Sequence, residues 1–168
     1  MRATFLGTGG SVPTKKRNLP SFAVRTNGGL VIFDCGEGTQ KQFLIAKLGF
    51  NREMKILISH MHADHILGLP GLLHSMSFMD RRRDLEIYGP RGIDEFVKCT
   101  TETVMFRSMF PIRTFEVHAG TIARTDSYTI SAAWADHGIP CLAYALAEND
   151  RPGRFYPSKA RRLGIPKG

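Results

Sequence analysis

The sequence contains little cysteine and no long apolar run. Its three cysteines, Cys35, Cys99 and Cys141, are scattered and form no C-x-x-C pair. This argues against a disulfide framework and against a thiolate zinc knuckle, so we expect all three to be small core residues. The longest apolar runs, such as residues 30–33 and 66–73, are too short to span a bilayer, and the first residues lack the apolar core of a signal peptide. We therefore expect a soluble, cytoplasmic protein with no membrane partner.

Acidic residues are few relative to basic ones. The 168 residues include 15 Asp plus Glu against 23 Lys plus Arg, a net charge of +8. Part of the excess lies in three runs, at residues 15–17, 81–83 and 151–167. Such runs favour a polyanionic partner, although for any single run solubility is a comparably good explanation.

The length and the 42% hydrophobic content predict one globular domain, which we place at residues 1–149. Residues 150–168 form a basic tail rich in Pro and Gly. Apolar and alternating segments predict strands at residues 3–6, 21–25, 30–34, 55–59, 84–88, 113–118, 128–135 and 141–147, and helices at about 36–48, 67–78 and 93–106.

Local signals refine these elements. The Asn-Gly-Gly turn at residues 27–29 predicts an antiparallel hairpin, and we expect a turn at residues 119–120. Pro70 is expected to interrupt its helix early. In the first helix, the core-facing spacing predicts that Phe43, Leu44 and Leu48 are buried.

Residues 60–65, with the sequence His-Met-His-Ala-Asp-His, follow the strand predicted at 55–59. Alternate residues of an extended segment point the same way, so His60 and His62 can share one metal ion. Asp64 and His65 can then turn toward a second ion. Clustered imidazoles with a carboxylate favour zinc, whereas the alternative is a solvated polar loop.

Other residues are candidates for completing this site. His137, at the abrupt end of a strand, is the best candidate for a third imidazole. Asp34 could accept a hydrogen bond from a ligand imidazole or could simply cap a turn. We expect His74 and His118 to be structural. The Gly-rich residues 7–10 lack a dinucleotide fingerprint and are interpreted as a strand-end turn beside the site.

Two close zinc ions would supply a hydroxide near neutral pH and hold both oxygens of a phosphoryl displacement, so the residues predict hydrolysis. Asp64 could be both a ligand and the general base.

The H-x-H-x-D-H motif and the residues around it resemble the metallo-β-lactamase superfamily, and within it the ribonuclease Z family, which trims the 3′ trailer from precursor tRNA. Further matching segments run nearly end to end: Phe-Leu-Gly-Thr-Gly at 5–9, Pro-Thr-Lys-Lys-Arg-Asn at 13–18, Phe-Asp-Cys-Gly-Glu-Gly-Thr-Gln at 33–40, His-Ile-Leu-Gly-Leu-Pro-Gly-Leu-Leu at 65–73, Tyr-Gly-Pro at 88–90, His-Gly at 137–138 and Leu-Gly-Ile-Pro at 163–166.

The resemblance implies an α/β fold, the N-terminal portion of an αββα sandwich. It implies that one zinc is bound by His60, His62 and His137, and the other by Asp64 and His65, with Asp64 as the proton acceptor. A loop bearing Lys15, Arg17 and Asn18 would contact the 3′ end of precursor tRNA. The tail at 150–168 would begin the arm that grips the tRNA.

The sequence also departs from that family. A bridging Asp in Gly-Asp-Thr, a last zinc-binding His and a His-Glu pair should follow the arm, and no Gly-Asp-Thr occurs here. We therefore expect an N-terminal half with little or no nuclease activity alone, which pairs with a complementary C-terminal half or forms a homodimer. The alternatives are another hydrolase of this fold, acting on phosphodiesters or sulfate esters, and a non-catalytic tRNA-binding half.

Overall fold

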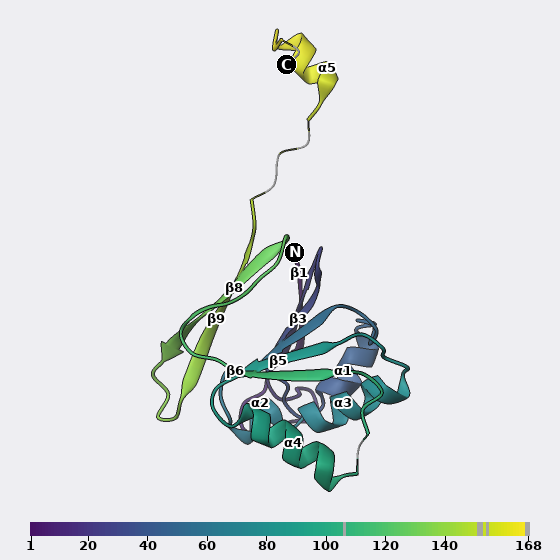
Figure 1. Cartoon of the computed structure of the whole chain (residues 1–168), viewed down its shortest axis with the longest axis vertical. Helices are drawn as coiled ribbons and strands as arrows, with labels where there is room; N and C mark the ends of the chain where they lie inside the picture. The colour runs from purple at the N-terminus through teal and green to yellow at the C-terminus, as the bar shows by residue number, and fades with distance from the viewer. Residues whose placement is uncertain (106, 151–152, 154, 167–168) are drawn as a thin grey trace.

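The computed structural model describes residues 1–105, 107–150, 153 and 155–166. A helical layer, a six-stranded sheet and a three-stranded sheet are stacked in that order (Figure 1). The strands are β1 (Arg2–Gly7), β2 (Ser21–Thr26), β3 (Gly29–Phe33), β4 (Met54–Leu57), β5 (Leu85–Gly89), β6 (Ile112–Glu116), β7 (Gly120–Arg124), β8 (Tyr128–Ala135) and β9 (Cys141–Glu148). The helices are α1 (Thr39–Ile45), α2 (Ala63–Ile66), α3 (Leu69–Phe78), α4 (Ile93–Thr103) and α5 (Pro157–Arg162).

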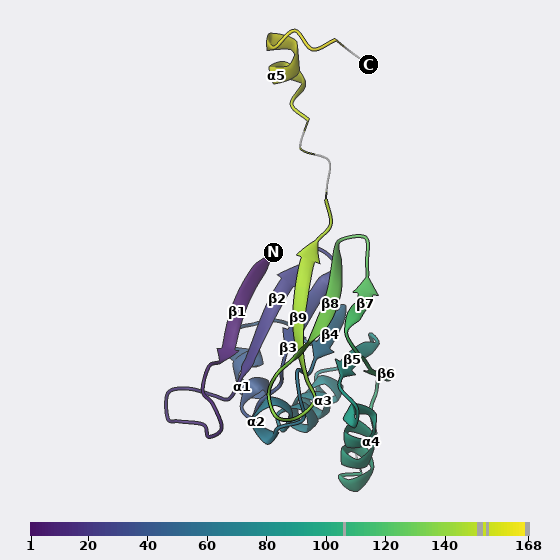
Figure 2. The same cartoon turned by 90° about the vertical axis from the view of Figure 1, so that its left-hand side faces the viewer.

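The larger sheet has the order β1-β2-β3-β4-β5-β6. Its first three strands are antiparallel, which confirms the predicted hairpin, and β3 to β6 run parallel. Parallel neighbours need crossover connections, which α1, α2 with α3, and α4 provide on one face (Figure 2). Because parallel strands end at the same edge, the loops after β3, β4 and β5 lie together there.

Alternate residues of the central strands serve two different cores. Ile32, Ile56 and Ile87 point toward the helices and belong to the larger apolar cluster. Val31 and Leu57 point the other way, toward the three-stranded sheet, and pack with a smaller cluster. Burial on both faces explains why these strands are continuous apolar runs.

The smaller sheet has the order β7-β8-β9 and is antiparallel throughout. Together with the helical layer and the larger sheet, it makes three layers of the predicted αββα sandwich, so the expected N-terminal portion of that fold is confirmed. Helix α5 lies away from both sheets in the two views (Figures 1 and 2). Within the part of the chain that the structure describes, no helix is long and apolar enough to cross a membrane.

The first helix is shorter than predicted. It ends at Ile45, and Lys47 already has a φ of 50°. Phe43 and Leu48 are buried as expected, but Leu44 is 52% exposed, so its predicted burial is wrong. Consecutive helical residues point about 100° apart, so with Phe43 directed straight at the core, Leu44 lies at the edge of the apolar face.

Three other local predictions need correction. Pro70 lies in the first turn of α3, where a proline costs no hydrogen bond, so it begins that helix rather than interrupting it. The turn expected at 119–120 is a bend at Ala119, and Gly120 already begins β7, a strand that the sequence does not predict. Cys99 is exposed on α4 and is therefore not a core residue, whereas Cys35 is buried. The end predicted for the third helix, residue 106, lies outside the described residues.

Candidate metal centre

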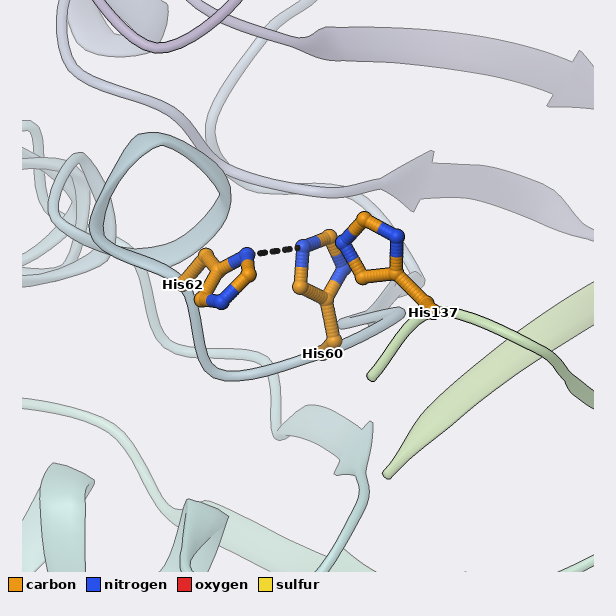
Figure 3. A group of neighbouring side chains, drawn as sticks. All are labelled: His60, His62 and His137. Atoms are coloured by element: carbon orange, nitrogen blue, oxygen red, sulfur yellow. Dashed lines mark hydrogen bonds between the residues drawn. The ribbon is translucent and has the colours of Figure 1, made fainter. Parts of the chain in front are cut away.

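Three imidazoles converge beyond the carboxyl end of β4. His60 and His62 lie on the loop that follows this strand, and His137 lies on the loop between β8 and β9 (Figure 3). One nitrogen from each ring can be chosen so that all three lie within 4.8 Å of one another. His60 is buried, whereas His62 and His137 are exposed. The structure thus brings together the three histidines that the sequence had predicted to share one ion.

Hydrogen bonds between the two sheets place His137. The amide of Leu142, at the start of β9, donates to the carbonyl of Ser59 at 2.8 Å. The hydroxyl of Tyr144 donates to the carbonyl of Ile58 at 2.9 Å. These bonds fasten β9 to the end of β4, so the loop before β9 is held above the histidine motif.

The three imidazoles fit a zinc ion. A tetrahedral centre with Zn–N bonds of about 2.0–2.1 Å separates its ligand atoms by roughly 3.3 Å. His60 Nε2 and His62 Nδ1 are 3.1 Å apart, close to that separation (Figure 3). A simple hydrogen bond would explain this pair, but it gives no reason for the imidazole of His137 to converge on the same point.

The turn after β3 packs closely against the histidine loop. The amide of Cys35 donates to the carbonyl of His65 at 2.8 Å, and the amide of Gly68 donates to the carbonyl of Cys35 at 2.9 Å. A Cβ atom on Gly36 would lie 2.4 Å from the carbonyl oxygen of Asp64, and one on Gly68 would lie 2.0 Å from that of Gly36. Only glycine permits this approach, so both glycines position the site.

Asp34 orients the loop through three hydrogen bonds. Its carboxylate accepts from the Ser59 amide at 2.7 Å, the Ser59 hydroxyl at 3.0 Å and His65 Nδ1 at 2.8 Å. The residue has a φ of 55°, a conformation that aspartate tolerates better than most residues. Asp34 thus accepts a hydrogen bond from an imidazole of the motif, as the first of its two interpretations requires.

Asp64 lies in the first turn of α2 and faces His65 and the first loop of the chain. Its Oδ2 accepts the Ser11 amide at 2.9 Å and lies 3.6 Å from His65 Nε2. The Gly-rich segment therefore leads to the site, as predicted. In the part of the chain that the structure describes, Asp64 and His65 do not belong to a group of three converging ligand atoms.

Burial and neighbouring groups shift the pKa values of three residues of the motif, and the shifts at His60 and Asp64 favour the forms that bind a metal. Burial, followed by the charge on His65, lowers the pKa of His60 to about 4, so this imidazole is neutral at pH 7. For His65, burial is the largest single influence and lowers the pKa, but the hydrogen bond to Asp34 and the charges of Asp34 and Asp64 together outweigh it, so the net pKa is raised. For Asp64, burial is the largest single influence and raises the pKa, but the amides of Ser11 and of Asp64 itself and the charges on His65 and His60 together outweigh it, so the net pKa is lowered.

The remaining candidates lie around this centre. Lys15 and Arg17 are exposed on the loop between β1 and β2, which projects from the sheet in Figure 2. Asn18 is half-buried, and its amide donates to the carbonyl of Gly38 at 3.4 Å. His74 is exposed on α3 with its ring 4.7 Å from that of Phe78.

Sequence reasoning missed Ser59 and Ser11. Ser59 contacts both Asp34 and the motif, and Ser11 holds Asp64. Their places in the sequence are the one feature that could have identified them. Ser59 directly precedes the first histidine of the motif, and Ser11 directly follows the Gly-rich turn.

A family profile described as Anti-Pycsar protein Apyc1 matches residues 1–101, more than half of the chain. The chain belongs to this family. The match includes the whole motif at 60–65 and ends before His137.

The chain is also similar to ribonuclease Z over its full length. It is 46% identical to ribonuclease Z of Methanosarcina acetivorans and 44% identical to that of Methanothermobacter thermautotrophicus, covering 55% and 54% of those proteins. Among solved structures, the short form of human tRNase Z matches 87% of this chain with a TM-score of 0.77 and 30% identity, and 64% of that protein is covered.

The chain therefore has the metallo-β-lactamase fold and corresponds to the N-terminal portion of ribonuclease Z. It spans about half the length of the curated relatives it matches.

Proposed function

We propose that the chain supplies one part of a zinc-dependent endoribonuclease that removes the 3′ trailer from precursor tRNA. The observation that carries the proposal is the convergence of His60, His62 and His137 at the end of β4. The similarity to ribonuclease Z over the whole chain supports the choice of substrate.

Each site residue has a distinct part in this proposal. His60, His62 and His137 would hold one zinc ion, and Asp64 with His65 would contribute to a second. Zinc supplies a Lewis acid that activates water for attack on a phosphodiester. The carboxylate of Asp64, kept ionised by the Ser11 amide, accepts the proton of the attacking water.

The second ion has only two protein ligands in this proposal, Asp64 and His65, too few for a tight site. We expect the missing ligands to come from a complementary C-terminal half. A homodimer is the alternative source, and the oligomeric state measured by sedimentation separates the two.

The edge of the smaller sheet could accept strands from a C-terminal half. β9 is an edge strand, with β8 on one side only. Next to this edge, the ring of Phe22 stacks on that of Phe33, with ring centroids 4.5 Å apart. Phe22 also contacts the ring of Phe5, which is 73% exposed. An open strand edge beside an aromatic row that ends at the exposed Phe5 is suited to receive further strands.

The loop between β1 and β2 is suited to hold RNA phosphates. The hydroxyl of Thr14 accepts the amides of Lys16 at 3.3 Å and Arg17 at 3.0 Å, which fixes a tight turn. We expect Lys15→Ala and Arg17→Ala each to weaken binding of precursor tRNA. Each should also reduce by roughly one the slope of the logarithm of affinity against the logarithm of salt concentration, because one phosphate contact is lost. Filter binding at several salt concentrations measures this, with Lys98→Ala on α4 as the control.

The proposal as a whole is tested with precursor tRNA, excess zinc and the 168-residue chain. Salt-dependent binding without cleavage, with cleavage appearing when a C-terminal half is added, is the expected result. Robust zinc-dependent cleavage by the chain alone would contradict the need for a second half. Hydrolysis of chromogenic phosphodiesters without binding of precursor tRNA would instead favour a different hydrolase of this fold. Binding that never leads to cleavage, even with the second half, would favour a non-catalytic role.

A further inference from the structure

The hydroxyl of Ser59 lies between a carboxylate and a histidine of the metal centre. Its Oγ is 3.0 Å from Asp34 Oδ2 and 2.9 Å from His60 Nδ1. The backbone amide of the same residue donates to Asp34 Oδ1 at 2.7 Å. Ser59 is therefore held to Asp34 through both its amide and its hydroxyl. The hydroxyl proton can point either to Asp34 Oδ2 or to His60 Nδ1.

Counting donors decides between them. A serine hydroxyl has one proton, and a carboxylate can only accept. If the proton pointed at His60, the lone pairs of Ser59 Oγ would face Asp34 Oδ2 at 3.0 Å with no hydrogen between the two oxygens. The proton therefore goes to Asp34, and Ser59 Oγ accepts from His60. That requires a hydrogen on His60 Nδ1.

This assignment leaves His60 Nε2 without a proton in the neutral ring. Nε2 is the atom that lies 3.1 Å from His62 Nδ1, where the three imidazoles converge (Figure 3). The nitrogen with the free lone pair is thus the one directed into the candidate metal site. The opposite tautomer would place a hydrogen there and block coordination.

His65 is fixed by a different contact. Its Nδ1 is 2.8 Å from Asp34 Oδ2 and 3.5 Å from Ser59 Oγ, so the carboxylate is its acceptor. Without the Ser59 hydroxyl, His60 should therefore no longer be restricted to one tautomer, whereas the tautomer of His65 should be unchanged. This difference separates a specific effect on His60 from a general loosening of the loop.

We infer that Ser59 is a positioning residue that relays the negative charge of Asp34 to His60 and selects the His60 tautomer with a free Nε2. This inference rests on the metal site of the proposed function, but it concerns the chain before any metal binds. Its failure is therefore distinguishable, since a wrong tautomer overturns it whatever the nuclease assay gives.

The first test uses the unaltered chain, freed of metal with a chelator and labelled with 15N in histidine. Long-range 1H–15N spectra report which ring nitrogen carries the proton, and His60→Gln identifies the signals of His60. We expect a protonated Nδ1 and a bare Nε2. A bare Nδ1 on His60 overturns the inference without any further variant.

The second test compares Ser59→Ala with Ser59→Thr, which keeps the hydroxyl. In Ser59→Ala, His60 should populate the Nε2–H tautomer while His65 keeps Nδ1–H, and zinc affinity should fall roughly 10-fold, as is usual when a partner of a metal ligand is lost. Ser59→Thr should restore both properties. Ser131→Ala, which removes a hydroxyl on β8, is the matched control. An unchanged His60 tautomer in Ser59→Ala, or equal shifts of His60 and His65, would overturn the inference.

Discussion

Two parts of one short loop differ in how much of a metal site they contain. The first two histidines of the motif at 60–65 meet a third imidazole, His137, which comes from the far end of β8. Asp64 and His65, at the end of the same motif, have Ser11 and Asp34 as polar neighbours instead. Among the described residues, only the first part brings three ligand atoms together.

The loop at 60–65 contributes residues to both parts, but it completes neither part by itself. Each part is completed by what packs over the end of β4. The sheet that contains β8 and β9 covers the first part, since β9 is fastened to the end of β4 and carries the preceding loop with it. In the proposed function, the remaining part would be completed by ligands from the C-terminal half.

The largest effect should follow from removing a ligand of the three-imidazole group. His60→Ala leaves two imidazoles and removes the only buried one, so we expect zinc affinity to fall by roughly 100-fold or more, beyond the loss caused by a neighbouring residue. Competition with a chromophoric chelator measures it. His118→Ala removes an exposed imidazole elsewhere and should change nothing. Equal affinities of His60→Ala and the unaltered chain would place the zinc site elsewhere.

A smaller effect should follow from Asp34→Asn, which affects both parts. Asparagine tolerates the positive φ at this position, so the backbone should persist. The new amide hydrogens would face Ser59 Oγ and His65 Nδ1, which reverses both hydrogen bonds and places hydrogens on the metal-facing nitrogens. We expect zinc to bind roughly 10-fold more weakly, measured beside the circular dichroism of the metal-free protein. A full loss of folded structure would show instead that Asp34 mainly stabilises the turn.

The sequence predicts the larger sheet better than the smaller one, for a physical reason. Strands such as β3 and β4 are buried on both faces and are therefore apolar throughout. β7 is a strand of five residues with none fully buried, so it lacks the apolar run by which the other strands are recognised. The mistake at Leu44 has a different cause, because spacing alone does not fix the direction in which a short helix faces the core.

The candidate site shows the same division. Histidines are few and their spacing is restrictive, so the motif and even the distant His137 are recognisable from the sequence. Serines are common, and the importance of Ser59 and Ser11 depends on which carboxylate the fold places beside them. Such contacts depend on tertiary structure and leave little trace in a single sequence.

The smallest effect should follow from Asp64→Asn. This change keeps the shape of the side chain and an oxygen that can accept the Ser11 amide, but it removes the charge. Because the three imidazoles already converge without Asp64, zinc affinity of this chain should change by less than about 3-fold, well below the loss expected for a partner of a metal ligand. The same chelator competition measures it, and His60→Ala provides the contrast. A loss as large as that of His60→Ala would mean that Asp64 binds the same ion as the imidazoles, and the two parts of the loop would then be a single site.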